Sequence, residues 1–200
     1  MNFDDTNNND EFYWEREFRK DDARIQSCMH EIPAVIDLPE EDELLMKRLQ
    51  KQPEYARNTQ KIDEPGFEDF LDFEDILFPE NWREREGASI YGRIEHLMKE
   101  WAGVYASQIT EKDNTAGIRI LCIYGKIMGF SIDLVDAGEE KMPGLKIALC
   151  KRIIAGINSI MAIINDIENL SVPEHAVSLK KLRHFVLNLR FKLNNEVDRN

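Results

Sequence analysis

The chain has 200 residues, of which 42% are hydrophobic and 32% are charged, and its formal net charge is −12. This length accommodates one domain with an appendage, or two small domains. Such an acidic balance argues against non-specific binding of nucleic acid or of an anionic membrane by the whole protein, and it favours basic partners.

The charge is distributed unevenly along the chain. Residues 1–87 hold 25 acidic and 11 basic side chains, whereas residues 88–200 hold 13 acidic and 15 basic ones. Five of the seven prolines also lie in the first part, while Ile, Leu and Met recur at helical spacing in the second. We therefore predict an acidic N-terminal arm of short helices and loops over residues 1–87, and a separate helical domain over residues 88–200.

Within the arm, apolar periodicity predicts helices over residues 10–29 and 40–52. The segment that follows, residues 67–82, alternates acidic with aromatic or aliphatic residues, a pattern typical of segments that become ordered on a partner surface. We favour docking on the chain's own helical domain, and binding to another protein's groove is the alternative. Its candidate partner-binding residues are Phe70, Phe73, Phe78 and Trp82.

Four helices are predicted in the second part, over about 89–109, 115–137, 143–167 and from 171 onward, each with apolar residues three or four positions apart. On the first of these helices, the stripe of apolar residues runs from Ile90 to Val104. The third helix is apolar almost all round, which places it at the centre or at an oligomer interface. Because the connections are short, we predict an all-α protein with an antiparallel four-helix bundle over about 88–197.

Glycines mark two of these helices. Gly125 and Gly129 lie one turn apart on the second helix, and Gly156 lies in the third. Since a glycine inside a helix costs about 1 kcal/mol relative to alanine, we expect these positions to allow close approach of a neighbouring helix. A dimer seam at Gly125 and Gly129 is the alternative.

The fourth helix carries a basic stripe, formed by Lys181, His184, Asn188 and Lys192 at spacings of three or four. Lys181, His184 and Lys192 are candidate partner-binding residues that could meet phosphates or an acidic protein. The interpretation that we favour is a solvated face that also receives the chain's own acidic half.

Catalytic and metal-binding patterns are weak. His96 and Glu100 stand four positions apart and could share a metal or a proton, but such pairs are usually ordinary surface pairs. A dimetal site would need a Glu-x-x-His motif, and the position three before His96 is occupied by Arg93. His96 and His184 are also the candidates for phosphotransfer. No nucleotide-binding, nucleophile-elbow or zinc-protease motif occurs. The sequence therefore predicts no catalytic residue, no metal site and no cofactor.

The remaining features concern the cellular compartment of the protein. The three cysteines show neither a disulfide framework nor zinc spacing, which indicates a reducing cytoplasm. The most apolar run, residues 153–164, is shorter than the roughly 20 residues of a membrane span, and the N-terminus lacks the pattern of a signal peptide.

Together these observations favour a non-enzymatic cytoplasmic helical-bundle protein that mediates protein–protein interaction, with a protein partner or self-association and no membrane. A nucleic-acid-associated regulator that uses the basic fourth helix is one alternative. An enzyme with a site between bundle and arm is another.

Overall fold

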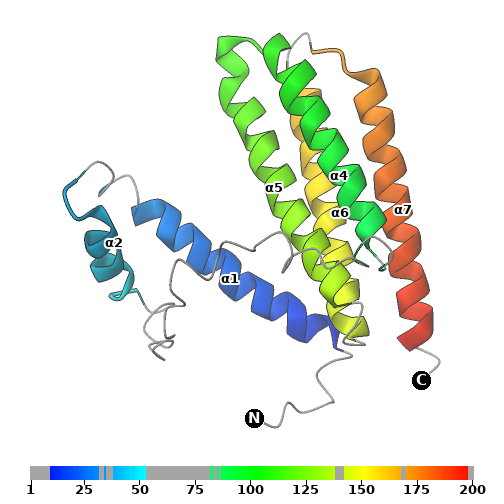
Figure 1. Cartoon of the computed structure of the whole chain (residues 1–200), viewed down its shortest axis with the longest axis horizontal. Helices are drawn as coiled ribbons and strands as arrows, with labels where there is room; N and C mark the ends of the chain where they lie inside the picture. Colours follow the sequence, from blue (N-terminus) through cyan, green and yellow to red (C-terminus); the bar gives the residue numbers. More distant parts are fainter. Residues whose placement is uncertain are drawn as a thin grey trace. The chain divides into compact units, whose positions relative to one another are not determined.

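The computed structural model describes residues 10–31, 34, 38–52, 82, 85, 87–137, 142–167 and 170–197 (Figure 1). These residues form helices and turns, and none of them lies in a β-strand. The all-α class is thereby confirmed. Phe70, Phe73 and Phe78 lie outside the described residues, so their predicted role as anchors stays a prediction.

Contacts between backbone segments divide the chain into two compact units. One unit combines Met1–Glu11 with Glu74–Asn200, and the other is Phe12–Phe73. The boundary that charge and composition suggest near residue 87 remains a prediction, and each unit is described by itself.

The smaller unit holds almost all of α1 (Glu11–Glu31) and the whole of α2 (Glu41–Leu49), close to the two helices expected in the arm. Arg48 of α2 donates a 3.2 Å hydrogen bond to the carboxylate of Glu31 at the end of α1. The Arg48 guanidinium holds the pKa of Glu31 below its usual value. Gln52 donates a 3.4 Å bond to the same carboxylate, so Glu31 links the ends of the two helices.

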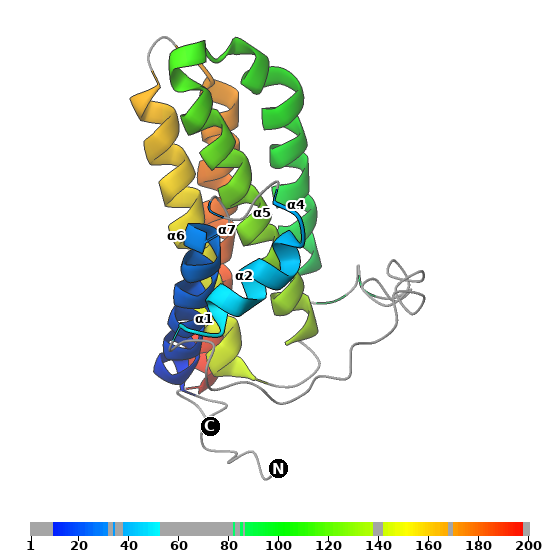
Figure 2. The same cartoon turned by 90° about the vertical axis from the view of Figure 1, so that its left-hand side faces the viewer.

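The larger unit contains four long helices: α4 (Ala88–Glu100), α5 (Asn114–Asp136), α6 (Pro143–Asp166) and α7 (Pro173–Val197). They run side by side, and the chain reverses direction at each connection (Figures 1 and 2). Consecutive helices contact each other, and α4 also contacts α7. We keep the predicted four-helix bundle as an interpretation of this arrangement.

Helix α6 supplies the largest share of the buried core of this unit, as its nearly continuous apolar sequence predicts. Although the sequence predicted an apolar run too short for a membrane span, α6 is long and apolar enough to cross a membrane, and half of its most apolar stretch is buried inside the chain. The fourth helix follows its predicted stripe, with Leu179, Leu182, Val186 and Leu193 buried. The buried aliphatic residues of α6 are Ile147, Ala148, Leu149, Ile153, Ile154, Ile157, Ile160 and Ile164.

The first predicted helix, 89–109, is not one regular α-helix. After α4 the chain forms a π-helical turn, Trp101–Tyr105, and then a 3₁₀ turn, Ala106–Gln108. The Trp101 side chain is fully buried, and its indole N–H donates a 3.4 Å hydrogen bond to the Gly117 carbonyl of α5. Because a π turn is wider than an α turn, it rotates the following side chains. Val104, predicted in the apolar stripe, is consequently 50% exposed.

The three glycines that were predicted to allow close approach of a neighbouring helix differ in their surroundings. A Cβ added at Gly156 of α6 would collide with a methyl group of Ile127, so this glycine does allow α5 to approach closely. A Cβ at Gly125 or Gly129 would meet nothing within 4 Å, and both residues are exposed. The prediction that these two glycines pack against a neighbouring helix of the same unit is therefore wrong. The dimer seam stays a prediction.

Candidate binding face between α4 and α7

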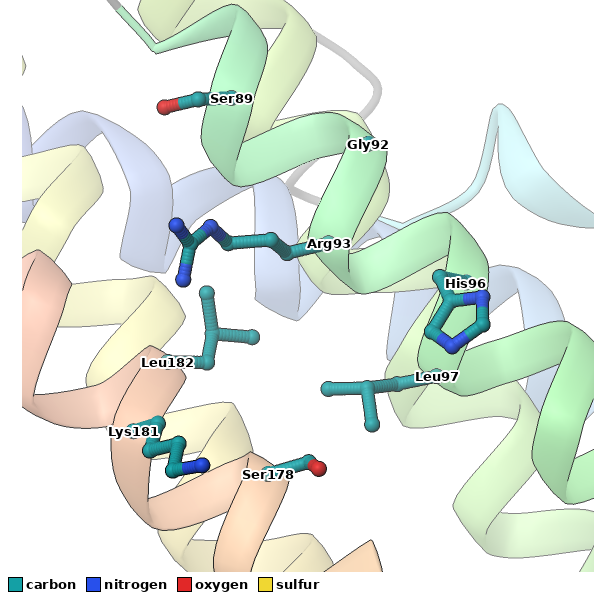
Figure 3. Close-up of a pocket in the computed structure, with 8 residues that line it drawn as sticks. All are labelled: Ser89, Gly92, Arg93, His96, Leu97, Ser178, Lys181 and Leu182. Atoms are coloured by element: carbon teal, nitrogen blue, oxygen red, sulfur yellow. The ribbon is translucent and has the colours of Figure 1, made fainter.

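A pocket of about 360 Å³ opens between α4 and α7 (Figure 3). Its apolar part is formed by Leu97 and Leu182, whose side chains extend from the two helices. Gly92 leaves further room, because a Cβ there would meet nothing within 4 Å. Polar side chains from both helices complete the lining: Ser89, Arg93, His96, Ser178 and Lys181.

Helical spacing explains why these side chains gather. Ile94 and Leu97 of α4 are buried, and Leu179 and Leu182 of α7 are buried as well, which anchors both helices through their apolar faces. Residues one turn apart on a helix share a face. The edge of each apolar stripe therefore presents two polar side chains to the same opening, Arg93 with His96 from α4 and Ser178 with Lys181 from α7.

The polar groups of the pocket are not satisfied within the part of the chain that the structure describes. Arg93 lies over the Phe185 ring, with 4.8 Å between the guanidinium carbon and the ring centroid. Among the described residues, no hydrogen bond or ion pair engages the side chains of His96, Lys181 or Ser178. None of the described lining residues is acidic. The pocket thus combines an apolar floor with uncompensated positive charge.

The basic stripe predicted on the fourth helix continues beyond the pocket. His184 and Lys192 are exposed on α7, as is Lys181, so all three candidate residues can meet a partner. Phe191, beside Lys192 in sequence, is 68% exposed, and Phe185 is 38% exposed. We call Lys181, His184, Phe185, Phe191 and Lys192 the α7 stripe. It presents aromatic rings among cations.

Arg190, on the same helix, has an acidic partner, unlike the cations of the α7 stripe. Its guanidinium donates a 3.4 Å hydrogen bond to Glu11, and Lys151 of α6 donates a 3.2 Å bond to the same carboxylate. Glu11 belongs to the same compact unit as these two cations. Arg190 thus has an acidic partner near the start of the chain, and the expectation that α7 receives the acidic half stays a prediction. Among the described residues, Lys181, His184 and Lys192 have no such partner.

Trp82 is the one candidate anchor of the acidic–aromatic segment that the structure describes. Its ring lies edge-to-face against Tyr91 of α4, with 5.6 Å between the ring centroids. Trp82 therefore packs on the chain's own helical unit, in line with the self-docking interpretation for this residue. The pKa of Tyr91 is raised by partial burial and by the nearby Glu95 carboxylate.

A second polar cluster lies in the interior between α4, α5 and α7. His175 of α7 is fully buried, and its Nδ1 lies 2.7 Å from a carboxylate oxygen of Glu100. Its Nε2 lies 2.8 Å from the hydroxyl of Tyr124, which is also fully buried. Tyr105 of the π turn donates a 3.5 Å bond to the other Glu100 oxygen. We call Glu100, Tyr124 and His175 the buried triad.

The proton positions in the buried triad follow from its chemistry. Because a carboxylate only accepts hydrogen bonds, Nδ1–H of His175 donates to Glu100, and in the neutral imidazole Nε2 accepts the hydroxyl proton of Tyr124. Burial, with a smaller contribution from the Glu100 charge, raises the pKa of Tyr124 far above its usual value and keeps this proton in place. Each side chain of the triad is thus satisfied.

The buried triad resembles a proton relay in geometry, but it is closed to a substrate. Tyr124 and His175 have no exposed surface, and only Glu100 is partly exposed. The π turn serves this cluster by bringing Trp101 and Tyr105 against the imidazole, with ring centroids 5.7 and 5.1 Å away. We conclude that the triad fixes the alignment of three helices.

Sequence reasoning missed the buried triad. It considered His96 as the partner of Glu100, whereas the carboxylate of Glu100 binds His175, 75 positions away. A usable signal was the position of His175 near the start of α7, four residues before the buried Leu179 and thus on the apolar side. His96 instead joins Lys181, a residue considered separately, in the pocket.

Within the described residues, no group of three or more His, Cys, Asp or Glu side chains is arranged to hold a metal ion. Comparison with protein-family models, with curated proteins and with solved structures gave no match.

Proposed function

We propose that this chain is a non-enzymatic cytoplasmic protein-interaction module that binds an acidic segment of a partner through the α7 stripe. The observation that supports this proposal is the exposure of Phe191 among cations that have no acidic partner in the described part of the chain. Aromatic residues often supply much of the binding energy at protein contact surfaces.

The partner's chemistry follows from that of the stripe. The cations favour carboxylates, and the aromatic rings favour apolar or aromatic side chains between them. An acidic segment with interspersed aromatic residues meets both requirements. The net charge of −12 on the whole chain opposes a densely charged phosphate backbone more strongly than a short acidic segment, whose charges are fewer and are spaced by apolar residues.

The proposal is tested with the full chain and a fluorescent peptide of alternating glutamate and phenylalanine residues. We expect binding that weakens with added salt, because exposed charges are screened. Phe191→Ala and Lys192→Glu should each weaken binding about tenfold. Arg119→Glu is the matched control, since it makes the same charge change at an exposed position of α5.

Two outcomes would overturn the proposal. One is equal binding by the wild type and by both stripe variants. The other is a preference for single-stranded RNA or DNA over the acidic peptide, which would assign the stripe to nucleic acid, because cations interleaved with aromatic rings also suit stacked bases.

A further inference from the structure

The pocket between α4 and α7 has the size and composition of a small-ligand site. Its volume of about 360 Å³ lies within the ~300–1,000 Å³ of typical ligand pockets. Such pockets are mostly apolar with a few convergent polar groups. Here Leu97 and Leu182 provide the apolar floor, and the polar side chains come from two facing helices (Figure 3).

The charge of the pocket indicates what kind of ligand it takes. Arg93 and Lys181 contribute two positive charges, and no described lining residue offsets them. Both cations line the same cavity, one from each helix, so an anion in the cavity is attracted by both. Ser178, drawn beside Lys181 in Figure 3, adds a hydroxyl group that can donate a hydrogen bond to an oxygen of such an anion.

We propose that this pocket binds a small organic phosphate monoester, with the phosphate at Arg93 and Lys181 and the apolar body against Leu97 and Leu182. A phosphate monoester carries close to two negative charges at neutral pH, which matches the two cations better than the single charge of a carboxylate. The guanidinium fork of Arg93 suits phosphate oxygens, and the ammonium of Lys181 acts as a point charge. This site is additional to the protein-binding α7 stripe, although Lys181 belongs to both.

Gly92 supplies a variant that blocks the pocket without disturbing the helices. Gly92 lines the pocket and a Cβ there would meet nothing within 4 Å, so Gly92→Leu adds a bulky side chain at the pocket wall and also removes a helix-weakening glycine. Gly125→Leu is the matched control, because Gly125 is a helical glycine with equally open surroundings, on α5 and away from the pocket.

The experiment titrates the full chain by calorimetry with phenyl phosphate, benzoate and phenol. We expect phenyl phosphate to bind at millimolar concentration or below, benzoate to bind about tenfold more weakly, and phenol not to bind. Gly92→Leu and Lys181→Met should each lose about tenfold or more in affinity, while Gly125→Leu binds as the wild type does. A melting temperature of Gly92→Leu equal to or above that of the wild type would show that the loss of binding is local.

Absence of phenyl phosphate binding would overturn the inference, as would equal binding of phenol or unchanged binding by Gly92→Leu. A phosphotyrosine tripeptide shows whether the phosphate monoester comes from a phosphorylated side chain or from a free small molecule. Tighter binding than that of phenyl phosphate assigns the site to a modified side chain, and equal or weaker binding assigns it to a free small molecule. Phe191→Ala and Lys192→Glu should leave phenyl phosphate binding unchanged, so that failure of the proposed protein interaction is distinguishable from failure of this site.

Discussion

Helices α4 and α7 carry two polar clusters that differ in almost every physical respect. In the buried triad, His175 has a hydrogen-bond partner at each ring nitrogen and no exposed surface. In the pocket, His96 and Lys181 are exposed and have no partner among the described residues. Both clusters contain a histidine and hydroxyl groups, so residue type alone does not distinguish them.

The difference shows how the two clusters divide their tasks. A buried polar group is costly unless it is paired, so a fully paired interior cluster specifies one alignment of the helices around it. Exposed cations without partners contribute little to stability and remain available to a ligand. We therefore assign the triad to stabilisation of the helix arrangement and the pocket to ligand binding. The following variants test these two assignments.

His175→Ala should have the largest effect. It leaves the Tyr124 hydroxyl and one Glu100 oxygen without their partner and opens a cavity, so we expect the free energy of unfolding to fall by about 3 kcal/mol or more. Urea unfolding followed by circular dichroism measures this change. His96→Ala, in the pocket, should alter it by less than about 0.5 kcal/mol. Equal effects of the two variants would contradict the division.

Gly156→Ala tests whether a closely packed position differs from an open one when no polar group is changed. The added methyl group collides with Ile127, and we expect destabilisation of about 1–3 kcal/mol from overpacking. Gly129→Ala, whose surroundings are open, should instead stabilise the protein by up to about 1 kcal/mol. Thermal melting of both variants measures the effects, and the same sign for both would refute the glycine assignment.

Tyr124→Phe should destabilise the protein by about 1–2 kcal/mol, because it removes the hydrogen bond to the imidazole and leaves Nε2 of His175 unsatisfied. It should also change the response to alkaline pH. Above the usual tyrosine pKa of 10.0 the unfolded state loses the phenolic proton, while the folded state, whose Tyr124 pKa is raised, retains it. The unfolded state then binds fewer protons, so the free energy of unfolding falls as pH rises.

This loss amounts to about 1.4 kcal/mol per pH unit for one tyrosine. Below pH 10 the contribution of Tyr124 is fully present. Denaturant unfolding of the wild type and of Tyr124→Phe at a series of pH values above 10 isolates it, because Tyr91 and Tyr105, whose pKa values are also raised, are common to both proteins. Parallel pH profiles would show that Tyr124 is not shielded from solvent.

Lys181→Met should have the smallest effect on stability, within about 0.5 kcal/mol in phosphate-free buffer, since the ammonium has no partner in the described part of the chain. Phenyl phosphate in excess should raise the melting temperature of the wild type, because a ligand that binds only the folded state stabilises it. The variant should show a much smaller rise. A drop in its stability comparable to that of His175→Ala would mean that the pocket is architectural.

Much of the fold could be predicted because helix formation leaves a local trace. The apolar residues of the fourth helix recur every three or four positions, and four of the five expected in its stripe are buried while Leu189 is half-buried. The composition of residues 143–167 predicted a helix at the centre or at an oligomer interface, and much of it is buried in the core. The π turn at Trp101 left no such trace, and its effect on Val104 was consequently missed.

The candidate site was predictable only in pieces. Lys181, His184 and Lys192 could be assigned to an exposed stripe from their spacing on one helix. That His96 shares a pocket with Lys181 depends on which faces of α4 and α7 adjoin, and periodicity within one helix carries no information on that. Similarly, Gly156 and Gly129 look alike in sequence, but only one faces another helix.

The sequence by itself determined that this protein is helical, which residues of the fourth helix turn inward, and that its charge divides near residue 87. Tertiary structure alone decided that Glu100 binds His175 across 75 positions, and that Arg93 and Lys181 face one cavity. The physical reason is the range of the interactions. Hydrogen bonds within a helix and apolar periodicity join residues a few positions apart, whereas polar pairing between helices depends on their relative rotation and height, which the packing of the whole core sets.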